Sequence, residues 1–336
     1  MKMKKKIFFD SRWIGEHGIG RFADEVRRTK LNFEDISLQG NPAGKFDTIK
    51  LTYFLFRNRH YFFSPGYNAP LFFLDRTIIT IHDLNHIDLN YNSSFLKKIY
   101  YKFVLKRACK KSALIFTVSE FSKRRIQEWA SIPLDKIKVV GNGVSDDFKP
   151  IGNVYNNNLE PYLLIVGNRK KHKNEQKAIS AFLQADIPNK YQLLIVGDET
   201  EELNHIIKED GSTVRVKFLG RVSNSELASL YRGAECLLFP SLYEGFGLPV
   251  IESMACGTPV ITSNVTSLPE IAGDAAVIIS PESVDEIKKA IERVIAMDHT
   301  AKDTMIKKGY AQVLNYSWEK TRAIVEKSIK EGFHLN

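Results

Sequence analysis

Two glutamates spaced eight positions apart bracket a glycine-rich turn in the second half of the chain. Glu244 and Glu252 enclose the segment EGFGLPVIE, with two glycines and a proline between the acids. We expect a helix here that runs to about Cys256, because Pro249 suits a first helical turn, where its missing N–H breaks no hydrogen bond. The N–H groups at such a helix start can hold a phosphate. The segment therefore predicts a nucleotide-sugar ligand, with one acid on each sugar ring and a diphosphate between them.

A basic loop between a predicted strand and a predicted helix suits the same anionic ligand. Residues 167–174 read GNRKKHKN. Cations at the end of a parallel strand can neutralise a diphosphate leaving group as charge develops on it. We expect Lys173 to bind phosphate, with Arg169 or His172 supplying a second positive charge. The alternative interpretation is a solvated basic loop.

Two further candidates lie in the first half of the chain. The loop at residues 15–21, GEHGIGR, follows the first expected strand, and Gly18, Ile19 and Gly20 allow close backbone approach to phosphate or sugar. A plain glycine turn is the alternative. His82 ends the expected strand TIITIHD, at the edge where parallel sheets bind ligands. It is a catalytic candidate, and a purely structural histidine is the alternative.

The elements that position these residues follow a repeating pattern. Strand-like apolar runs alternate with helical patterns throughout, which predicts an α/β fold with parallel sheets and crossover helices. The expected strands are residues 6–10, 48–54, 60–64, 77–82, 113–119, 138–141, 162–167, 192–197, 215–219, 236–240, 259–263 and 276–280.

The clearest linker is the polar, turn-rich stretch at residues 150–158. We therefore place a domain boundary there, with Rossmann-like domains at residues 1–150 and 151–316. Ligands bind at the carboxyl ends of the strands in such folds, so we expect the two domains to face a central cleft. The remaining residues, 317–336, are expected to form a terminal helix.

Composition narrows the class of protein. The 336 residues are 43% hydrophobic, enough for two cores, yet no apolar run approaches the roughly 18 residues of a spanning helix. The basic start at residues 1–6 continues into only three apolar residues, which favours a buried strand over a signal peptide. The three cysteines show no metal-ligand spacing and fit a reducing cytoplasm.

The net charge of +9 suggests an anionic partner, which is a nucleic acid, a membrane surface or a phosphorylated substrate. No zinc-finger or RNA-binding aromatic signature is present. Residues 95–111 combine a basic face, which could touch anionic lipid, with an apolar stripe, which we expect to pack into the core. The stripe consists of Phe95, Leu96, Ile99, Tyr100, Phe103 and Val104.

Taken together, these segments resemble the retaining glycosyltransferases of the GT-B fold, especially family four. The E-x7-E run YEGFGLPVIESMACGTPVI carries most of the resemblance, supported by Lys173-Asn174, the early glycine loop, NGV at residues 142–144 and FLGRVS at residues 218–223. The resemblance extends over nearly the whole chain. Two departures are Ser145, where the family has aspartate, and Arg169, which comes one residue later than the family's basic position.

The resemblance implies a role for each candidate. Glu244 would bind hydroxyls of the donor sugar, Glu252 would bind the ribose, and His82 would approach the transferred sugar. Lys173 and Arg169 would stabilise the departing diphosphate. The implied donor-binding residues are Gly18, Ile19, Gly20, Val222, Gly245, Phe246, Gly247, Leu248 and Glu252. The terminal helix would return to the first domain, as in the family.

The chain is similar to bacterial mannosyltransferases of O-antigen and cell-surface polysaccharide synthesis. We therefore expect mannose from GDP-mannose as donor, with rhamnose, glucose and N-acetylglucosamine donors left open. The acceptor would be lipid-linked or polysaccharide, with no nucleic-acid partner, and the enzyme would act in the cytoplasm or at the inner face of the membrane. No D-x-D motif occurs, which favours a metal-independent reaction without a cofactor. A nucleotide-sugar epimerase and a non-catalytic protein that binds anionic surfaces are the alternatives.

Overall fold

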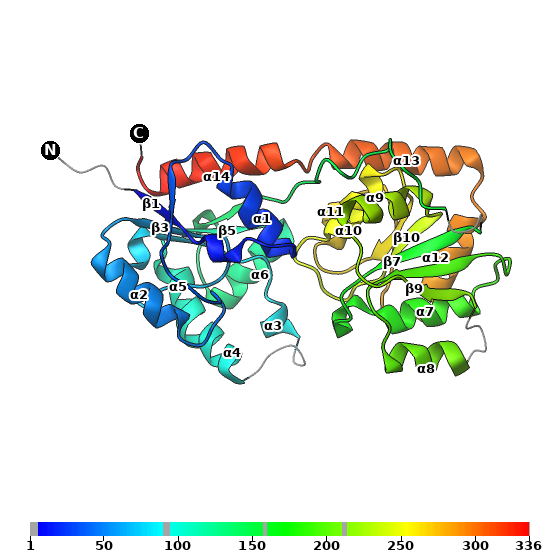
Figure 1. Cartoon of the computed structure of the whole chain (residues 1–336), viewed down its shortest axis with the longest axis horizontal. Helices are drawn as coiled ribbons and strands as arrows, with labels where there is room; N and C mark the ends of the chain where they lie inside the picture. The colour runs from blue at the N-terminus through cyan, green and yellow to red at the C-terminus, as the bar shows by residue number, and fades with distance from the viewer. Residues whose placement is uncertain (1–5, 90–94, 157–159, 210–213, 336) are drawn as a thin grey trace. The chain divides into compact units, whose positions relative to one another are not determined.

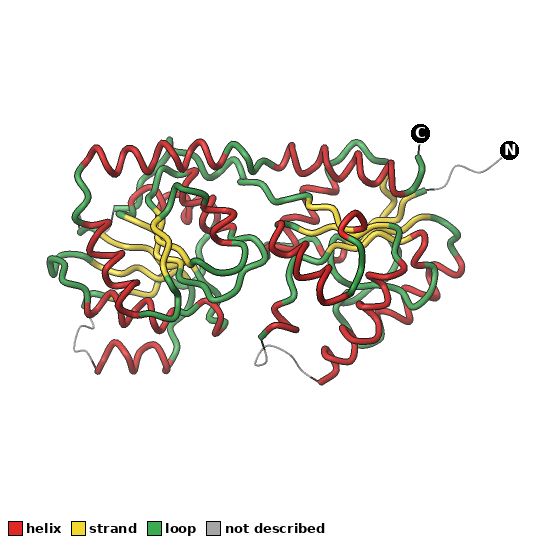
Figure 2. The backbone as a smooth tube through the Cα atoms, turned by 180° about the vertical axis from the view of Figure 1, so that it is seen from behind, coloured by secondary structure: helices red, strands yellow, loops and turns green. Residues whose placement is uncertain are grey.

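The computed structural model describes residues 6–89, 95–156, 160–209 and 214–335. The chain divides into two compact units: unit 1 comprises Met1–Gly143 and Trp318–Asn336, and unit 2 comprises Val144–Ser317. Each unit has a central sheet with helices around it (Figure 1; Figure 2). The predicted α/β class is therefore confirmed. The expected basic start and the expected linker lie in part outside the described residues.

Unit 2 is built on a parallel sheet whose strand order reverses in its middle. The strands lie in the order β12-β11-β10-β7-β8-β9, and all neighbouring pairs run parallel. The switch falls between β7 and β10, and α/β sheets bind ligands beyond the carboxyl ends of the strands at such a switch. The strands are β7 (Tyr162–Val166), β8 (Gln192–Val196), β9 (Val216–Phe218), β10 (Cys236–Phe239), β11 (Val260–Ser263) and β12 (Val277–Ile279).

Alternation along the strands gives the sheet of unit 2 two apolar faces. Leu163 and Ile165 of β7 pack in one core cluster with Phe182 of α7 and Ile291 of α12. The helices are α7 (Glu175–Gln184), α8 (Glu201–Glu209), α9 (Asn224–Gly233), α10 (Leu248–Ala255), α11 (Leu268–Ala272), α12 (Val284–Ile295) and α13 (His299–Val313).

Unit 1 also has a parallel sheet, in the order β2-β1-β3-β4-β5-β6, with its reversal between β1 and β3. The strands are β1 (Ile7–Phe9), β2 (Phe33–Asp35), β3 (Tyr61–Ser64), β4 (Thr77–Thr80), β5 (Leu114–Thr117) and β6 (Ile137–Val139). The helices are α1 (Gly18–Arg27), α2 (Asp47–Arg57), α3 (Asn85–Asp88), α4 (Phe95–Ile99), α5 (Lys106–Lys111), α6 (Glu120–Ala130) and α14 (Trp318–Gly332).

The last helix, α14, packs on the sheet and on α1 of unit 1. Val325 and Ile329 share a core cluster with Phe22 and Val26 of α1. Arg322 forms an ion pair with Glu25, also on α1. The final turns of the chain are therefore part of the hydrophobic core of unit 1.

The expected strand at residues 48–54 is wrong, because this segment lies inside helix α2. The apolar residues that α2 buries, Leu51, Phe54 and Leu55, recur at helical spacing. The neighbouring apolar side chains, which made the run look like a strand, are exposed. The short edge strand β2 was not predicted, since only Phe33 of its three residues is buried.

Residues 95–111 form one helical run in which a π-helical segment, Tyr100–Leu105, joins α4 to α5. Its buried side is made of Tyr101, Leu105, Ala108 and Cys109. Leu96, Ile99 and Phe103 are instead exposed, so the expectation that the stripe packs into the core is wrong for these three, whereas Tyr100 packs against a core cluster. The wider turn of a π-helix changes the register, and the spacing of a regular α-helix does not hold across it.

Candidate functional site

An ion pair between Lys173 and Glu244 lies beyond the two strands at which unit 2 reverses its order. Lys173 is in the loop after β7, and Glu244 follows β10. The Lys173 Nζ is 2.6 Å from Glu244 Oε1, and the two side chains are only 14% and 13% exposed. The ammonium group also lies over the ring of Phe239, 5.1 Å from its centroid. Two predicted catalytic residues, 71 positions apart, are thus in contact where such sheets bind ligands.

Hydroxyl side chains hold Glu244 and its backbone in place. The Ser241 hydroxyl donates to Glu244 Oε1 at 2.7 Å, and Thr266 Oγ1 accepts from the Glu244 N–H at 3.2 Å. Ser267 donates to the carbonyls of Glu244 and Phe246, at 2.9 Å each. Thr266 has φ of 60°, an unfavourable conformation for a β-branched residue that is typical of functional sites. These residues were not predicted, although hydroxyls directly after β10 and β11 mark the same sheet edge.

The start of α10 has the geometry of a candidate phosphate cradle. Gly247 precedes the helix with φ of 108°, and Pro249 lies in its first turn. The backbone angle favours glycine at this position, and a Cβ there would lie 2.7 Å from Leu268 Cδ2, so that side chain would have to shift. First-turn N–H groups have no partner within a helix, which makes them suitable for an anion. The predicted donor-binding residues here are Gly245, Phe246, Gly247 and Leu248.

Glu252, the second acid of the motif, lies one turn inside α10. It is 3% exposed, and the Tyr231 hydroxyl of α9 donates to its Oε2 at 3.2 Å. A buried carboxylate needs such partners, because an unpaired one carries a large desolvation cost. Glu252 thus has a fixed orientation, which suits recognition of a ligand hydroxyl.

Arg169 does not join Lys173 and Glu244 but forms a separate ion pair with Glu175, at 2.5 Å. Its Nε donates to the Asp198 carbonyl at 2.6 Å, and its φ is 62°. Burial raises the pKa of Glu175, and the charge and hydrogen bond of Arg169 oppose that shift. Arg169 therefore ties the loop after β7 to the end of β8. His172, the other candidate cation of this loop, is buried.

Val222 follows β9 and is half-buried beside a helix cap. The cap is a capping box in which Ser223 and Glu226 each accept a backbone N–H of the other. A cavity of about 820 Å³ opens next to this segment, lined by residues of α8 and β9, including Phe218, and by Gly220 after β9. The structure thus places Val222 on the opposite side of β7 from Glu244 in the strand order.

In unit 1, the predicted glycine loop forms the start of α1, Gly18–Arg27. His17 caps this helix, since its Nδ1 accepts from the Gly20 N–H at 3.0 Å. A Cβ at Gly20 would come within 2.3 Å of the Gly15 carbonyl oxygen, so only glycine allows this close approach of two backbone segments. Gly18, Ile19 and Gly20 therefore lie together in the first turn of α1.

His82 lies beyond the end of β4, close to the same helix. Its Nε2 is 2.9 Å from the Pro65 carbonyl oxygen, and its ring is edge-on to Phe22 of α1, with centroids 5.0 Å apart. A carbonyl oxygen can only accept, so Nε2 carries the proton and Nδ1 is the acceptor nitrogen. Burial lowers the pKa of His82 to about 4, with the nearby His17 also lowering it and the Pro65 hydrogen bond opposing the shift. His82 is therefore neutral near pH 7.

We expect acid to destabilise the fold through His82. In the folded chain its pKa is about 4, whereas an unfolded histidine has a pKa of about 6.5, so between these values the unfolded state binds more protons. The free energy of unfolding is therefore not lowered by His82 above about pH 6.5, and it falls by up to about 3 kcal/mol as the pH approaches 4. Urea unfolding of the wild type and His82→Gln across this range measures the effect. Equal pH dependence in both proteins would contradict the assignment.

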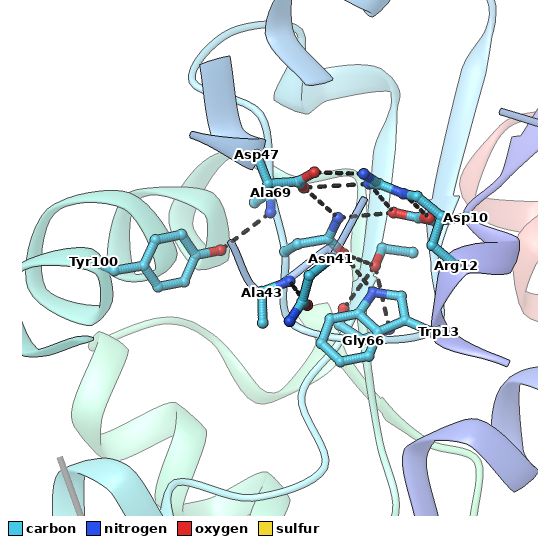
Figure 3. Close-up of polar contacts among 11 residues, drawn as sticks. Asp10, Arg12, Trp13, Asn41, Ala43, Asp47, Gly66, Ala69 and Tyr100 are labelled. Carbon is cyan, nitrogen blue, oxygen red and sulfur yellow. Dashed lines mark hydrogen bonds and ion pairs between the residues drawn. The ribbon is translucent and has the colours of Figure 1, made fainter. Parts of the chain in front are cut away.

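A buried polar cluster, not predicted from the sequence, lies at the carboxyl ends of β1 and β3, where unit 1 reverses its strand order (Figure 3). The Arg12 guanidinium bridges Asp10 at 2.7 Å and Asp47 at 2.5 Å. Asn68 donates to both carboxylates, at 2.8 and 3.0 Å, and accepts from Trp13 Nε1. Burial alone would lower the pKa of Arg12, but the two aspartates raise it, so Arg12 stays charged. The cluster fixes the segment that leads to α1.

Comparison with known proteins places the chain in an enzyme family. The family model described as Glycosyl transferases group 1 matches residues 151–312, and the model described as Glycosyltransferase Family 4 matches residues 58–148. The O-antigen chain mannosyltransferase B of Escherichia coli is 30% identical over 270 residues, which cover 75% of this chain and 71% of that protein. The chain belongs to the glycosyltransferases. The family predicted from the sequence is confirmed.

Further comparisons agree on family and fold. The O-antigen chain mannosyltransferase RfbU of Salmonella typhimurium is 32% identical over 245 residues, covering 71% of this chain and 66% of that protein. The solved structure of a sucrose-phosphate synthase from Thermosynechococcus elongatus matches with a TM-score of 0.80 at 18% identity, over 99% of this chain and 100% of that one. This glycosyltransferase therefore has the GT-B fold that the sequence predicts.

The described part of the glycosyltransferase also bears on three other features: a membrane-spanning helix, a metal site and a reactive cysteine. None of its helices has the length and apolar composition needed to cross a bilayer. The same residues contain no group of three or more His, Cys, Asp or Glu side chains arranged to hold a metal ion. Burial raises the pKa of the Cys109 and Cys236 thiols to about 12, so neither is a nucleophile near pH 7.

Proposed function

We propose that this enzyme transfers mannose from GDP-mannose to a hydroxyl group of a lipid-linked or polysaccharide acceptor. The likeness to two relatives named O-antigen chain mannosyltransferases, at 30% and 32% identity, carries the proposal. The contact between Lys173 and Glu244 at the strand switch supports it. A nucleotide sugar needs a cation for its diphosphate and hydrogen-bond acceptors for its sugar hydroxyls, and this pair offers both.

The diphosphate is stabilised by Lys173 and by the backbone N–H groups at the start of α10. The structure pairs Lys173 with Glu244. A bound diphosphate takes over the ammonium group, which leaves the Glu244 carboxylate to accept hydrogen bonds from the sugar. Arg169 contributes positive potential from its position between Glu175 and the end of β8. The negative charge that develops on the leaving group is thus met by groups already in place.

The reaction retains the configuration of the anomeric carbon. The bond from that carbon to the diphosphate oxygen breaks through an oxocarbenium-like transition state. The acceptor oxygen forms its new bond on the same face, and the departing phosphate takes the acceptor proton. Glu244 is not a covalent nucleophile in this scheme but binds sugar hydroxyls, while Glu252 binds the ribose. His82, neutral near pH 7, approaches the transferred sugar as a hydrogen-bonding group.

The enzyme acts at the cytoplasmic face of the cell membrane, where a lipid-linked acceptor is anchored. Residues 95–111 carry seven Lys or Arg side chains and no acid. Such a segment is attracted to anionic lipid at a membrane surface. The partners are therefore the nucleotide sugar, the saccharide acceptor and the lipid surface.

We expect turnover of GDP-mannose in the presence of a lipid-linked oligosaccharide acceptor and none of UDP-glucose, UDP-N-acetylglucosamine or dTDP-rhamnose. Mass spectrometry of the product and NMR of its anomeric proton measure transfer and retention. EDTA should leave the rate unchanged, because Lys173 and the start of α10 take the place of a bridging metal. Turnover with another donor alone would refute the mannose assignment. Loss of activity in EDTA, restored by a divalent cation, would refute metal independence.

A further inference from the structure

Large apolar side chains are exposed together on one part of unit 1. Five of the six exposed aromatic side chains in the described residues, Tyr155 being the sixth, lie between residues 46 and 103. Phe46, Ile49, Tyr53 and Phe56 line α2 at helical spacing, with 58–69% of each side chain exposed. Phe72 in the loop after β3 is 58% exposed, and Phe103 in the π-helical segment is 62% exposed. Exposed clusters of this size on a soluble domain usually mark an interaction surface.

The loop after β3 connects the two parts of this cluster, because it is hydrogen-bonded both to α2 and to the helical run at residues 95–111. The Leu71 N–H donates to Thr52 Oγ1 of α2 at 2.7 Å. On its other side, the Leu71 carbonyl accepts from Arg107 of α5. The Tyr100 hydroxyl accepts from the Ala69 N–H at 3.1 Å (Figure 3). We call this surface the aromatic–basic face, made of Phe46, Ile49, Tyr53, Phe56, Phe72, Leu96, Ile99 and Phe103.

Basic side chains surround the aromatic–basic face. Residues 45–59 contain four Lys or Arg and a single acid, and residues 95–111 contain seven and none. The single acid, Asp47, is buried against Arg12 and does not offset the surface charge. Three cations lie beside aromatic rings of the face: Arg57 by Tyr53, Lys102 by Phe103 and Arg107 by Phe72. The face therefore presents exposed apolar side chains with positive charge beside three of its aromatic rings.

The combination of exposed apolar side chains and positive charge indicates which partner would bind the aromatic–basic face. A second copy of the chain would bring like charges together, which disfavours a symmetric dimer through this face. A lipid surface with anionic headgroups matches both components, because the rings enter the boundary between headgroups and acyl chains while Lys and Arg stay at the headgroups. Phe and Tyr beside Lys and Arg are the side chains that favour this boundary.

We propose that the aromatic–basic face docks on an anionic lipid bilayer, with Phe46, Ile49 and Phe56 of α2 as its main inserted side chains. The inference rests on the proposed function for its purpose, which is to hold unit 1 at the surface where a lipid-linked acceptor is anchored. It adds α2 and Phe72 to the basic helix as the parts that reach the lipid.

The test is co-sedimentation of the full chain with vesicles of phosphatidylcholine alone and of phosphatidylcholine mixed with phosphatidylglycerol. We expect binding to the anionic vesicles only, and its loss near 1 M salt, where the Debye length is about 3 Å. The triple variant Phe46→Ser, Ile49→Ser, Phe56→Ser should bind at least about tenfold more weakly, because three inserted apolar groups are removed.

The matched control replaces three exposed apolar side chains of unit 2, Ile151, Val154 and Leu314, by serine. Its binding should equal that of the wild type. Equal binding by both triple variants, or no binding of the wild type to anionic vesicles, would overturn the proposal. So would a wild-type dimer in solution that the α2 variant abolishes, since a second copy would then cover the face. Transfer to a detergent-dispersed acceptor, with no vesicles present, should survive in the α2 variant. If the wild type and both variants all fail to transfer under these conditions, the result counts against the proposed function and not against the docking face.

Discussion

Replacement of Lys173 by alanine is expected to lower kcat about 10²–10³-fold, the usual cost of removing one preorganised group that stabilises a developing negative charge. Lys173 is the cation held at the strand switch of unit 2, 2.6 Å from Glu244. Without it, the charge on the departing diphosphate is met only by the start of α10 and, more remotely, by Arg169. The measurement is the steady-state rate of GDP release from GDP-mannose with acceptor present.

The control for this prediction lies in the same loop. Lys171 is exposed and two positions from Lys173, so Lys171→Ala removes an equal charge from the same region. Its kcat should stay close to that of the wild type. Circular dichroism and the thermal midpoint of Lys173→Ala show whether the variant is folded. A folded Lys173→Ala with wild-type kcat would remove Lys173 from the mechanism.

Glu244→Gln is expected to abolish most transfer while leaving GDP binding intact. The carboxylate is placed to accept hydrogen bonds from the donor sugar, and each hydrogen bond to a charged group is worth about 1.5–3 kcal/mol. Loss of two such bonds in the transition state predicts a decrease of about a hundredfold or more in kcat/KM. GDP lacks the sugar, and the substitution releases the Lys173 ammonium group from its ion pair, so GDP should bind at least as tightly as it does to the wild type. Calorimetry with GDP and initial rates with GDP-mannose separate the two effects.

Glu252→Ala serves as the opposite control, because Glu252 is assigned to the ribose. It should weaken GDP and GDP-mannose alike. If Glu244→Gln instead weakened GDP as strongly as Glu252→Ala does, Glu244 would not be a sugar-binding residue. In that case its contact with Lys173 would serve only to shape the diphosphate site.

The fold of both units was largely predictable, because strands buried on both faces of a parallel sheet appear in the sequence as continuous apolar runs. Tyr162–Val166 and Gln192–Val196 are such runs, and the structure pairs them residue by residue. Prediction failed where apolar residues face solvent. Phe46, Ile49, Tyr53 and Phe56 are exposed on α2, and their presence concealed the helical spacing of the buried Leu51, Phe54 and Leu55.

The candidate site was predictable in part. The motif with Glu244 and Glu252 is local, and its Pro249 indicated a helix start, which the structure places at Leu248. The contact of Lys173 with Glu244 follows once β7 and β10 are neighbours, and this depends on the strand order, which no local pattern encodes. The support from Thr266, and the buried Arg12 cluster of unit 1, come from residues distant in sequence. Individual Ser, Thr, Asp and Arg side chains carry no signal of such pairing.

The central claim, a nucleotide-sugar site for GDP-mannose that includes Glu252, is tested most directly by thermal shift with GDP, UDP, dTDP, CDP and ADP. We expect saturable stabilisation by GDP alone, about 2.7 kcal/mol at a hundred times the dissociation constant, and its loss in Glu252→Ala. This measurement needs no acceptor, so it is independent of the acceptor's identity. Stabilisation by a different nucleotide would contradict the GDP-mannose assignment. Stabilisation by none of the five would contradict the nucleotide-sugar site itself.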